Sequence, residues 1–211
     1  MLEEEGHRKK IILASASPRR REILKLLKLD FKVIKPEKCE ERQLKDPYRT
    51  VAYNSINKAR NVYNYIKECR LKSKRPGRVE QFLIAGFDTI ISLGSRYLGK
   101  PADIGEAIEF LNILSGRVHR VISGVCILDS ASGKYYYDTE CTRVKFRKLT
   151  AEEVKGYMDK EDVLDKAGAY NIFGTGSLLV DKIDGCFYNV AGLPVVKFVD
   201  LLKKFGFKVI G

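Results

Sequence analysis

Short apolar runs alternate along the chain with longer stretches in which apolar residues recur at helical spacing. The run Ile11–Ala14 is followed by Ser15-Ala16-Ser17 and then by a segment with apolar residues at helical spacing from Ile23 to Leu27. This pattern predicts a strand, a turn and a helix. The helix is expected to begin at Pro18, because proline suits the first helical position, where an N–H group has no acceptor.

The remaining elements follow the same two patterns. After a short strand over 31–34, a helix is predicted over 47–69, with Asp46 before Pro47 as its start signal. Further helices are expected over 104–114, over 151–159 and from Pro194, and strands over 82–87, 90–93, 119–128, 135–146, 178–180 and 183–190. Because hairpin strands occur among strands joined through helices, we predict an α/β fold with a mixed, twisted β-sheet and flanking helices.

Three arginines, Arg19–Arg21, fall in the first turn of the helix that begins at Pro18, where positive charge opposes the helix dipole. An anion between the first-turn N–H groups and the guanidinium groups would remove this conflict, because helix N-termini bind anions. Ser17 is the expected N-cap. A solvated arginine face is the alternative. The segment has no glycine-rich loop, so amides, hydroxyls and guanidinium groups would hold the anion.

Asp88 stands inside an apolar stretch, between Phe82–Phe87 and Ile90–Leu93. A carboxylate there is costly to bury unless a metal ion or a lysine faces it. An edge or bulged position in the sheet would also tolerate the aspartate. The sequence alone gives weaker reason to assign a functional role to Lys58 or His119, since helical lysines are usually solvated and strand histidines are usually structural.

Composition narrows the class of partner. The formal net charge of +12 favours anionic ligands such as nucleotides, nucleic acid or acidic surfaces. The five cysteines are scattered, no C-x-x-C pair occurs and there are two histidines, so neither a zinc site nor a disulfide framework is predicted. No apolar run is long enough to span a membrane, and the aromatic residues are not arranged for RNA stacking. The basic segment 70–80 is expected to be a surface loop.

The chain is expected to hold one domain. Residues 1–10 are acidic and then basic, with no apolar signal region, and predict a frayed N-terminal tail on a cytoplasmic protein. Residues 11–211 are long enough for one large domain or for two small ones that share a cleft, and we expect a single domain.

Eight short motifs occur in an order and at a spacing that resemble the Maf family of nucleoside triphosphate pyrophosphatases, over about Ile11 to Phe205. They are Ser15–Arg20, Asn57–Arg60, Gly86–Thr89, Gly99–Pro101, Leu114–Arg117, Phe146–Arg147, Asp165–Tyr170 and Val190–Pro194. The resemblance implies a hydrolase, a nucleoside triphosphate diphosphatase that cleaves between the α and β phosphates. It also implies a two-lobed fold, similar to that of ITPases, around a deep cleft, a divalent metal ion (Mg or Mn) as cofactor, and a cytoplasmic house-cleaning homodimer.

The same resemblance implies roles for single residues. It places the general base at Asp88 and the phosphate-binding groups at Ser15, Arg19, Arg20, Lys58 and Lys100. The metal is expected at Asp88 and Glu40, with Glu41 one position away. These roles agree with the chemistry, because phosphoanhydride hydrolysis needs an in-line water, neutralised charge and a good leaving group.

The base preference rests on three positions. Arg20 and Thr89 match the branch of the family that acts on dTTP and UTP, but Phe173 stands where that branch carries glutamine. Glutamine reads a pyrimidine edge by hydrogen bonds, whereas phenylalanine only stacks or packs. We therefore expect dTTP, UTP or related nucleotides, modified ones included, as substrates. The alternatives are a non-catalytic nucleotide-responsive binding protein in septum control, and nucleic-acid binding through the loop at 70–78.

Overall fold

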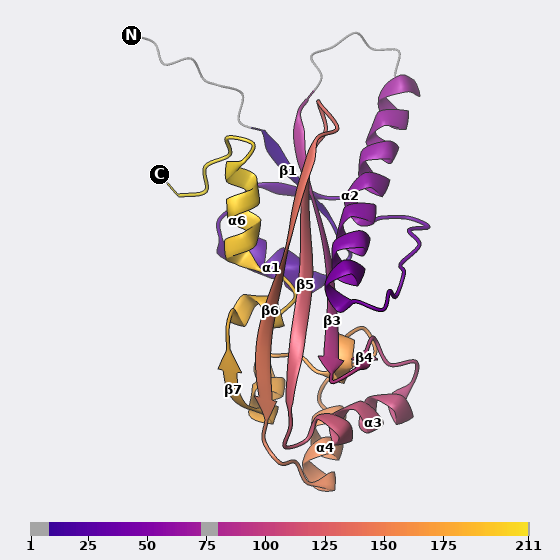
Figure 1. Cartoon of the computed structure of the whole chain (residues 1–211), viewed down its shortest axis with the longest axis vertical. Coiled ribbons are helices and arrows are strands. Elements are labelled where there is room, and N and C mark those ends of the chain that lie inside the picture. Colours follow the sequence, from indigo (N-terminus) through magenta and orange to yellow (C-terminus); the bar gives the residue numbers. More distant parts are fainter. Residues whose placement is uncertain (1–8, 73–79, 211) are drawn as a thin grey trace.

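A mixed β-sheet runs along the length of the molecule (Figure 1). The computed structural model describes residues 9–72 and 80–210. In those residues the sheet has seven strands in the order β2-β1-β3-β5-β6-β7, with β4 paired to β3. The strands are β1 (Lys10–Ala14), β2 (Phe31–Val33), β3 (Phe82–Leu93), β4 (Arg96–Leu98), β5 (Val118–Asp129), β6 (Tyr135–Phe146) and β7 (Val180–Asp184).

Strand direction changes across the sheet. β1 is parallel to β2 on one side and to β3 on the other, while β3, β5, β6 and β7 pair antiparallel. The predicted mixed sheet is therefore confirmed. The chain leaves β1 toward β2 and later returns to its other side as β3, so the carboxyl end of β1 is a topological switch point, where α/β folds commonly bind ligands.

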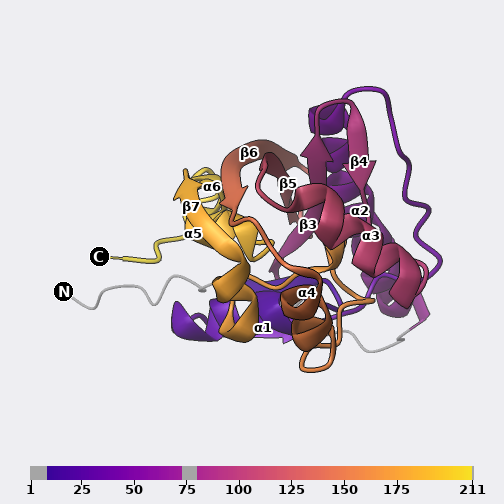
Figure 2. The same ribbon diagram turned by 90° about the horizontal axis from the view of Figure 1, so that it is seen from below.

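Helices cover both faces of the sheet, which is why the inner strands are apolar on both sides. Ile12 and Ala14 pack with α2 (Pro47–Lys72), whereas Ile11 and Leu13 belong to the larger core on the other face. That larger core includes residues of α1 (Pro18–Leu26) and α6 (Val195–Lys203). Figure 2 shows α2 and α6 on opposite sides of the long strands.

A second group of helices lies at the end of the sheet away from β1 and β2 (Figure 1). It contains α3 (Ile104–Leu114), α4 (Ala151–Met158) and the 3₁₀ turn η1 (Ala167–Ala169). Both helices begin at a capping residue: Asp103 accepts a bond from the Glu106 N–H, and Thr150 and Glu153 form a capping box. The two-lobed prediction is confirmed, with this group as the smaller lobe.

Two glycines let α2 approach the sheet very closely. A Cβ atom on Gly86 of β3 would lie 2.2 Å from the Ser55 carbonyl oxygen, and one on Gly124 of β5 would lie 2.2 Å from the Val51 carbonyl oxygen. Gly124 is the residue paired with Asp88 across the β3–β5 ladder. The α2 backbone therefore rests on the sheet at Asp88, and side chains of α2 reach this carboxylate.

The structure corrects three predicted elements. The runs 82–87 and 90–93 are one continuous strand, β3, so Asp88 occupies neither an edge nor a bulge. The strand predicted over 178–180 is wrong, because Gly174–Leu179 form a 3₁₀ helix, η2, in which Gly174 has a φ of 61° and Gly176 touches the Asn171 backbone. The strand predicted over 183–190 is wrong beyond Asp184, where β7 ends.

Hydrogen bonds to distant strands explain why the predicted strand does not continue beyond Asp184. Phe187–Val190 form the short helix α5, and its Asn189 is fully buried. Asn189 Nδ2 donates to the Val121 carbonyl and to Thr142 Oγ1, which fixes the turn against β5 and β6. These long-range contacts override the apolar pattern that predicted a strand.

Two predicted segments lie largely outside the described residues. These are residues 1–8 of the predicted tail and residues 73–79 of the predicted basic loop, whose first residues, 70–72, belong to α2. Within the described residues, no helix has the length and apolar character needed to cross a membrane.

Candidate active site

A cavity of about 860 Å³ opens at the carboxyl end of β1. Its size falls in the range of about 300–1,000 Å³ that small-molecule sites usually have. The walls come from the turn between β1 and α1, from α2, from the middle of β3, from Gly99-Lys100, from Asp165–Tyr170 and from Val190–Gly192. An extended segment over residues 35–45, which we call the strap, forms the remaining wall with residues such as Cys39 and Glu41.

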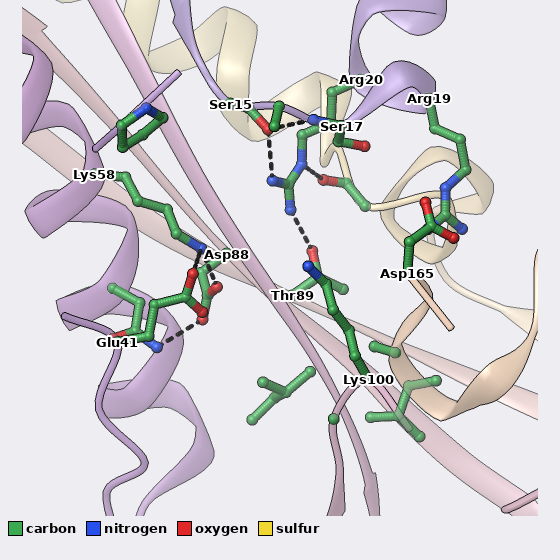
Figure 3. Close-up of a pocket in the computed structure, with 18 of the residues that line it drawn as sticks. Ser15, Ser17, Arg19, Arg20, Glu41, Lys58, Asp88, Thr89, Lys100 and Asp165 are labelled. Carbon is green, nitrogen blue, oxygen red and sulfur yellow. Dashed lines mark hydrogen bonds and ion pairs between the residues drawn. The ribbon is translucent and has the colours of Figure 1, made fainter. Parts of the chain in front are cut away.

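A buried carboxylate lies in this cavity (Figure 3). Asp88 is only 5% exposed, and its Oδ1 accepts a hydrogen bond of 2.7 Å from Lys58 Nζ. The same ammonium lies 2.9 Å from Glu41 Oε1 on the strap. Lys58 is therefore no solvated helical lysine, and it supplies the positive partner that the buried aspartate requires.

The second oxygen of Asp88 has its own partner, which the sequence did not indicate. Asn54 Nδ2 donates to Asp88 Oδ2 over 3.0 Å, and both side chains are buried. Asn54 lies one helical turn before Lys58 on α2, so both reach the carboxylate from one helix face. The spacing of four residues between Asn54 and Lys58 was the available sign in the sequence that both side chains share one helix face. It did not single out Asn54, because an asparagine in a helix belongs to no functional motif.

Arg20 ties together several walls of the cavity. Its Nε donates to the Gly192 carbonyl, its Nη1 to Ser15 Oγ and the Phe87 carbonyl, and its Nη2 to Thr89 Oγ1. Burial lowers the pKa of this guanidinium to about 10, and the charge of Asp88 acts against that shift. Because its donors are engaged by the protein, Arg20 mainly holds the site in shape.

The N-terminus of α1 lines the cavity as the sequence predicted. Ser17 is the N-cap residue, but its hydroxyl makes no capping bond; its own N–H donates to Ser15 Oγ. The N–H groups of the first helical turn have no acceptor within a helix. Together with the helix dipole they form a wall suited to phosphate oxygens.

Two further cations, Arg19 and Lys100, line the cavity. Within the described part of the chain, neither Arg19 nor Lys100 makes a hydrogen bond or salt bridge with another side chain. Burial lowers the pKa of Arg19, and Asp165 opposes this. Burial raises the pKa of Asp165, but the bond from Lys166 and the charges of Lys166, Arg19 and Lys100 hold it below its usual value. Figure 3 shows Asp165 beside Arg19.

The cavity gathers most of the residues that the sequence singled out. Ser15, Arg19, Arg20, Lys58, Asp88, Thr89 and Lys100 all line it. Glu40 and Phe173 do not. Glu40 pairs with Arg42 at 3.3 Å, and Phe173 packs edge-on against Phe187 with ring centroids 5.5 Å apart.

The donor set suits a hard divalent cation better than a softer one. Asp88 and Glu41 come from different elements, yet both contact the Lys58 ammonium, so their oxygen atoms converge on one positively charged position. Among the residues that the structure describes, no three His, Cys, Asp or Glu side chains form a metal cluster. Mg²⁺ is commonly held by one or two carboxylates plus water and substrate phosphates, so this pair fits such an ion.

Comparison with known proteins extends these observations. A family model described as "Maf-like protein" matches residues 10–205. A dTTP/UTP pyrophosphatase of Thermoanaerobacter sp. (strain X514) is 44% identical over 195 residues, which cover 92% of this chain and 96% of the relative. A dTTP/UTP pyrophosphatase of Clostridium botulinum (strain Okra / Type B1) is 41% identical over 200 residues, 94% of this chain and 98% of the relative. The solved structure of a HAM1 protein from Coxiella burnetii aligns with a TM-score of 0.40 and 19% identity, covering 67% of this chain and 74% of that one.

Proposed function

Because the chain belongs to the Maf-like protein family, we propose that it is a nucleoside triphosphate pyrophosphatase acting on dTTP, UTP or related nucleotides. The products are the nucleoside monophosphate and pyrophosphate. The observation that carries the proposal is the buried Asp88 carboxylate, which Lys58 and Asn54 hold in a cavity that also exposes the N-terminus of α1. A positioned carboxylate beside an anion-binding wall is what phosphoanhydride hydrolysis needs.

The triphosphate binds along the basic wall. Phosphate oxygens accept hydrogen bonds from the first-turn N–H groups of α1 and from the hydroxyls of Ser15 and Ser17, since these groups line the cavity together. Arg19 and Lys100 add charge without first having to break a protein salt bridge. Arg20 keeps the Ser15 hydroxyl and the Gly192 turn in place around the ligand.

Asp88 acts as the general base. It accepts a proton from a water molecule whose oxygen attacks the α phosphorus, while the bond from that phosphorus to the bridging oxygen breaks and pyrophosphate leaves. A positioned base of this kind contributes about 10²–10⁴ in rate. Lys58 turns from Asp88 toward the phosphates and stabilises the charge that develops on the leaving group.

Asp88 and Glu41 would hold the divalent metal ion, Mg²⁺ or Mn²⁺. Glu41 takes the place that the sequence gave to Glu40, because Glu41 lines the cavity and Glu40 faces Arg42. When bound, the ion supplies positive charge next to the phosphate oxygens. Lys58 occupies the space between the two carboxylates, so its movement toward the phosphates frees both of them.

The base preference follows the relatives, which are dTTP/UTP pyrophosphatases. Thr89 lines the cavity and Arg20 holds its hydroxyl, which supports a role for this pair in shaping the base site. Phe173 packs against Phe187 outside the cavity lining and offers no hydrogen bond to a base. Without a side chain that hydrogen-bonds to the base at this position, a broader base preference is supported, one that includes related or modified nucleotides.

The wider setting belongs to the same proposal. We place the enzyme in the cytoplasm as a homodimer, as its family resemblance implies. The alternative of a non-catalytic protein in septum control has no support in the site, which carries a complete set of base and cations.

The test is a substrate screen with Mg²⁺ or Mn²⁺. We expect the protein to release monophosphate and pyrophosphate from dTTP and UTP, and Asp88→Asn to lose at least about 10²-fold in kcat while still binding nucleotide, because the amide cannot accept the proton. Activity of Asp88→Asn equal to that of the wild type would remove the general-base role. Absence of hydrolysis by the wild type for every nucleoside triphosphate would overturn the proposed function.

A further inference from the structure

The strap is fastened to α2 by one stripe of polar side chains. Asn61 binds both backbone groups of Glu37, Asn57 donates to the Glu40 carbonyl, Asn54 binds both backbone groups of Arg42, and Thr50 binds both of Leu44. These four residues recur at helical spacing, so they form a single ladder along the helix. The strap has no secondary structure of its own, and the ladder supplies hydrogen-bond partners for the backbone of four of its residues.

Two rungs of the ladder have the same geometry. Asn61 Oδ1 accepts from the Glu37 N–H at 3.1 Å and its Nδ2 donates to the Glu37 carbonyl at 2.8 Å. Asn54 Oδ1 accepts from the Arg42 N–H at 2.9 Å and its Nδ2 donates to the Arg42 carbonyl at 3.2 Å. Only Asn54 also donates to Asp88. Asn54 and Asn61 therefore form a matched pair: both anchor the strap in the same way, but only Asn54 contacts Asp88.

The orientation of the Asn54 amide follows from these bonds. A backbone N–H is a donor, so the Asn54 atom that faces the Arg42 N–H must be the oxygen. The nitrogen then faces both the Arg42 carbonyl and Asp88 Oδ2, and each of its two hydrogens has one acceptor. The amide is fully satisfied in a buried position, which leaves it little freedom to rotate.

We infer that Asn54 is a positioning residue for the general base, and this inference rests on the proposed function. Lys58 and Asn54 hold the two oxygens of Asp88, but Lys58 also contacts Glu41 and is needed by the phosphates. When Lys58 turns to the substrate, the neutral amide of Asn54 has no such competing demand and keeps its bond to Oδ2. It thereby fixes the plane of the carboxylate and with it the direction from which the attacking water meets Asp88.

Asn54 also links the base to the strap. Its amide joins the Arg42 backbone to Asp88, and Glu41, which faces the cavity, is the neighbour of Arg42. One side chain therefore contributes both to the position of the strap and to the orientation of the base. A misplaced base loses rate far more than binding, since small errors in reacting geometry cost on the order of 10²-fold.

The test compares Asn54→Leu with Asn61→Leu on dTTP hydrolysis. Each change replaces an amide by an apolar group of similar size and removes one rung of the strap ladder. We expect Asn54→Leu to lower kcat by about 10–10²-fold. Its affinity for an α,β-methylene analogue of dTTP, measured calorimetrically, should stay within about threefold, as should the kcat of Asn61→Leu.

A second variant keeps the inference testable if Asn54→Leu folds poorly. Asn54→Asp keeps the shape and the acceptor for the Arg42 N–H but replaces the donor to Asp88 by an oxygen. Because two carboxylates in contact share a proton, the variant is assayed over a pH series up to the alkaline limit of the wild-type enzyme. Once both carboxylates are ionised, it should lose kcat at least as strongly as Asn54→Leu, with analogue binding again retained.

Each outcome distinguishes the positioning role from the proposed function. Equal kcat losses in Asn54→Leu and Asn61→Leu would show that Asn54 acts only as a strap anchor and would overturn the inference. A kcat of Asn54→Leu and Asn54→Asp close to that of the wild type would do the same. In both cases the wild-type hydrolysis, and with it the proposed function, would stand; an inactive wild type would remove the function itself.

Discussion

Arg20 is a cation whose hydrogen-bond donors are engaged by other groups of the protein. Its four hydrogen bonds join the turn before α1, the middle of β3 and the Gly192 turn, and they use all three of its nitrogens. Lysine keeps the positive charge but has one nitrogen and no planar fork, so it cannot reach these separated acceptors together. The neighbouring Arg21 is exposed and lies on the same helix.

Replacing Arg20 by lysine is therefore expected to damage the site despite the retained charge. We expect Arg20→Lys to lower the free energy of unfolding by about 2 kcal/mol, because hydrogen bonds from a charged group are lost and buried acceptors are left unpaired. The KM for dTTP should rise as the Ser15 and Gly192 walls loosen. Urea unfolding and steady-state kinetics measure both effects, and Arg21→Lys should change neither. A wild-type KM and stability for Arg20→Lys would contradict this role.

Single residues show what a sequence can and cannot assign. Asp88 stood out because a carboxylate in an apolar run needs a partner, and the structure supplies Lys58. Asn54 did not, because its bond to Asp88 joins residues far apart in the sequence and depends on how closely α2 docks. Glu41 lines the cavity whereas Glu40 pairs with Arg42, and no pattern in the sequence fixes which of these neighbours faces the cavity.

The docking of α2 on the sheet is the feature of secondary structure on which the site depends most. A Cβ atom on Gly86 would meet the backbone of α2 at Ser55 and Ala59, the residues that directly follow Asn54 and Lys58. Backbone atoms cannot move aside as a flexible side chain can. An added methyl group must therefore push the helix away from β3 and lengthen its bonds to Asp88.

Gly86→Ala is expected to lower both stability and kcat. Overpacking at a tight contact costs about 1–3 kcal/mol, and the displaced helix should reduce kcat at least about tenfold through misplacement of Asp88 and Lys58. Gly156→Ala in α4 is the control, since a Cβ atom added there would meet nothing within 4 Å and the backbone is helical. Thermal unfolding and kcat for dTTP provide the comparison. Wild-type values for Gly86→Ala would show that the close approach is not required.

Elements with strong local signals were predicted well, and those decided by distant contacts were not. Strand β1, helices α1, α3 and α4 and the β5–β6 hairpin follow from periodicity and capping residues. The helix at Phe187–Val190 was missed because its conformation is fixed by Asn189, which bonds to β5 and β6. The continuity of β3 through Asp88 was missed because a charged residue in a run normally marks its end.

Across the whole molecule, the site is assembled by topology. The turn after β1, the face of α2 and the middle of β3 are distant in sequence, yet the reversal of strand order at β1, with β2 on one side and β3 on the other, brings them to one cavity. The order of the motifs was enough to predict the class of fold and to identify most of the residues that line the site. It did not predict how these side chains are oriented relative to one another, because that depends on the packing of α2 across Gly86 and Gly124.

The central claim is that this cavity directs water to the α phosphorus of a nucleoside triphosphate, and isotope labelling tests it most directly. The wild-type protein is incubated with dTTP and a divalent metal in water enriched in oxygen-18, and the products are weighed by mass spectrometry. We predict dTMP and pyrophosphate, with the label in dTMP, and formation of labelled dTMP by Asp88→Asn that is slower by at least about 10²-fold. Label in pyrophosphate, or release of dTDP and inorganic phosphate, would contradict the account.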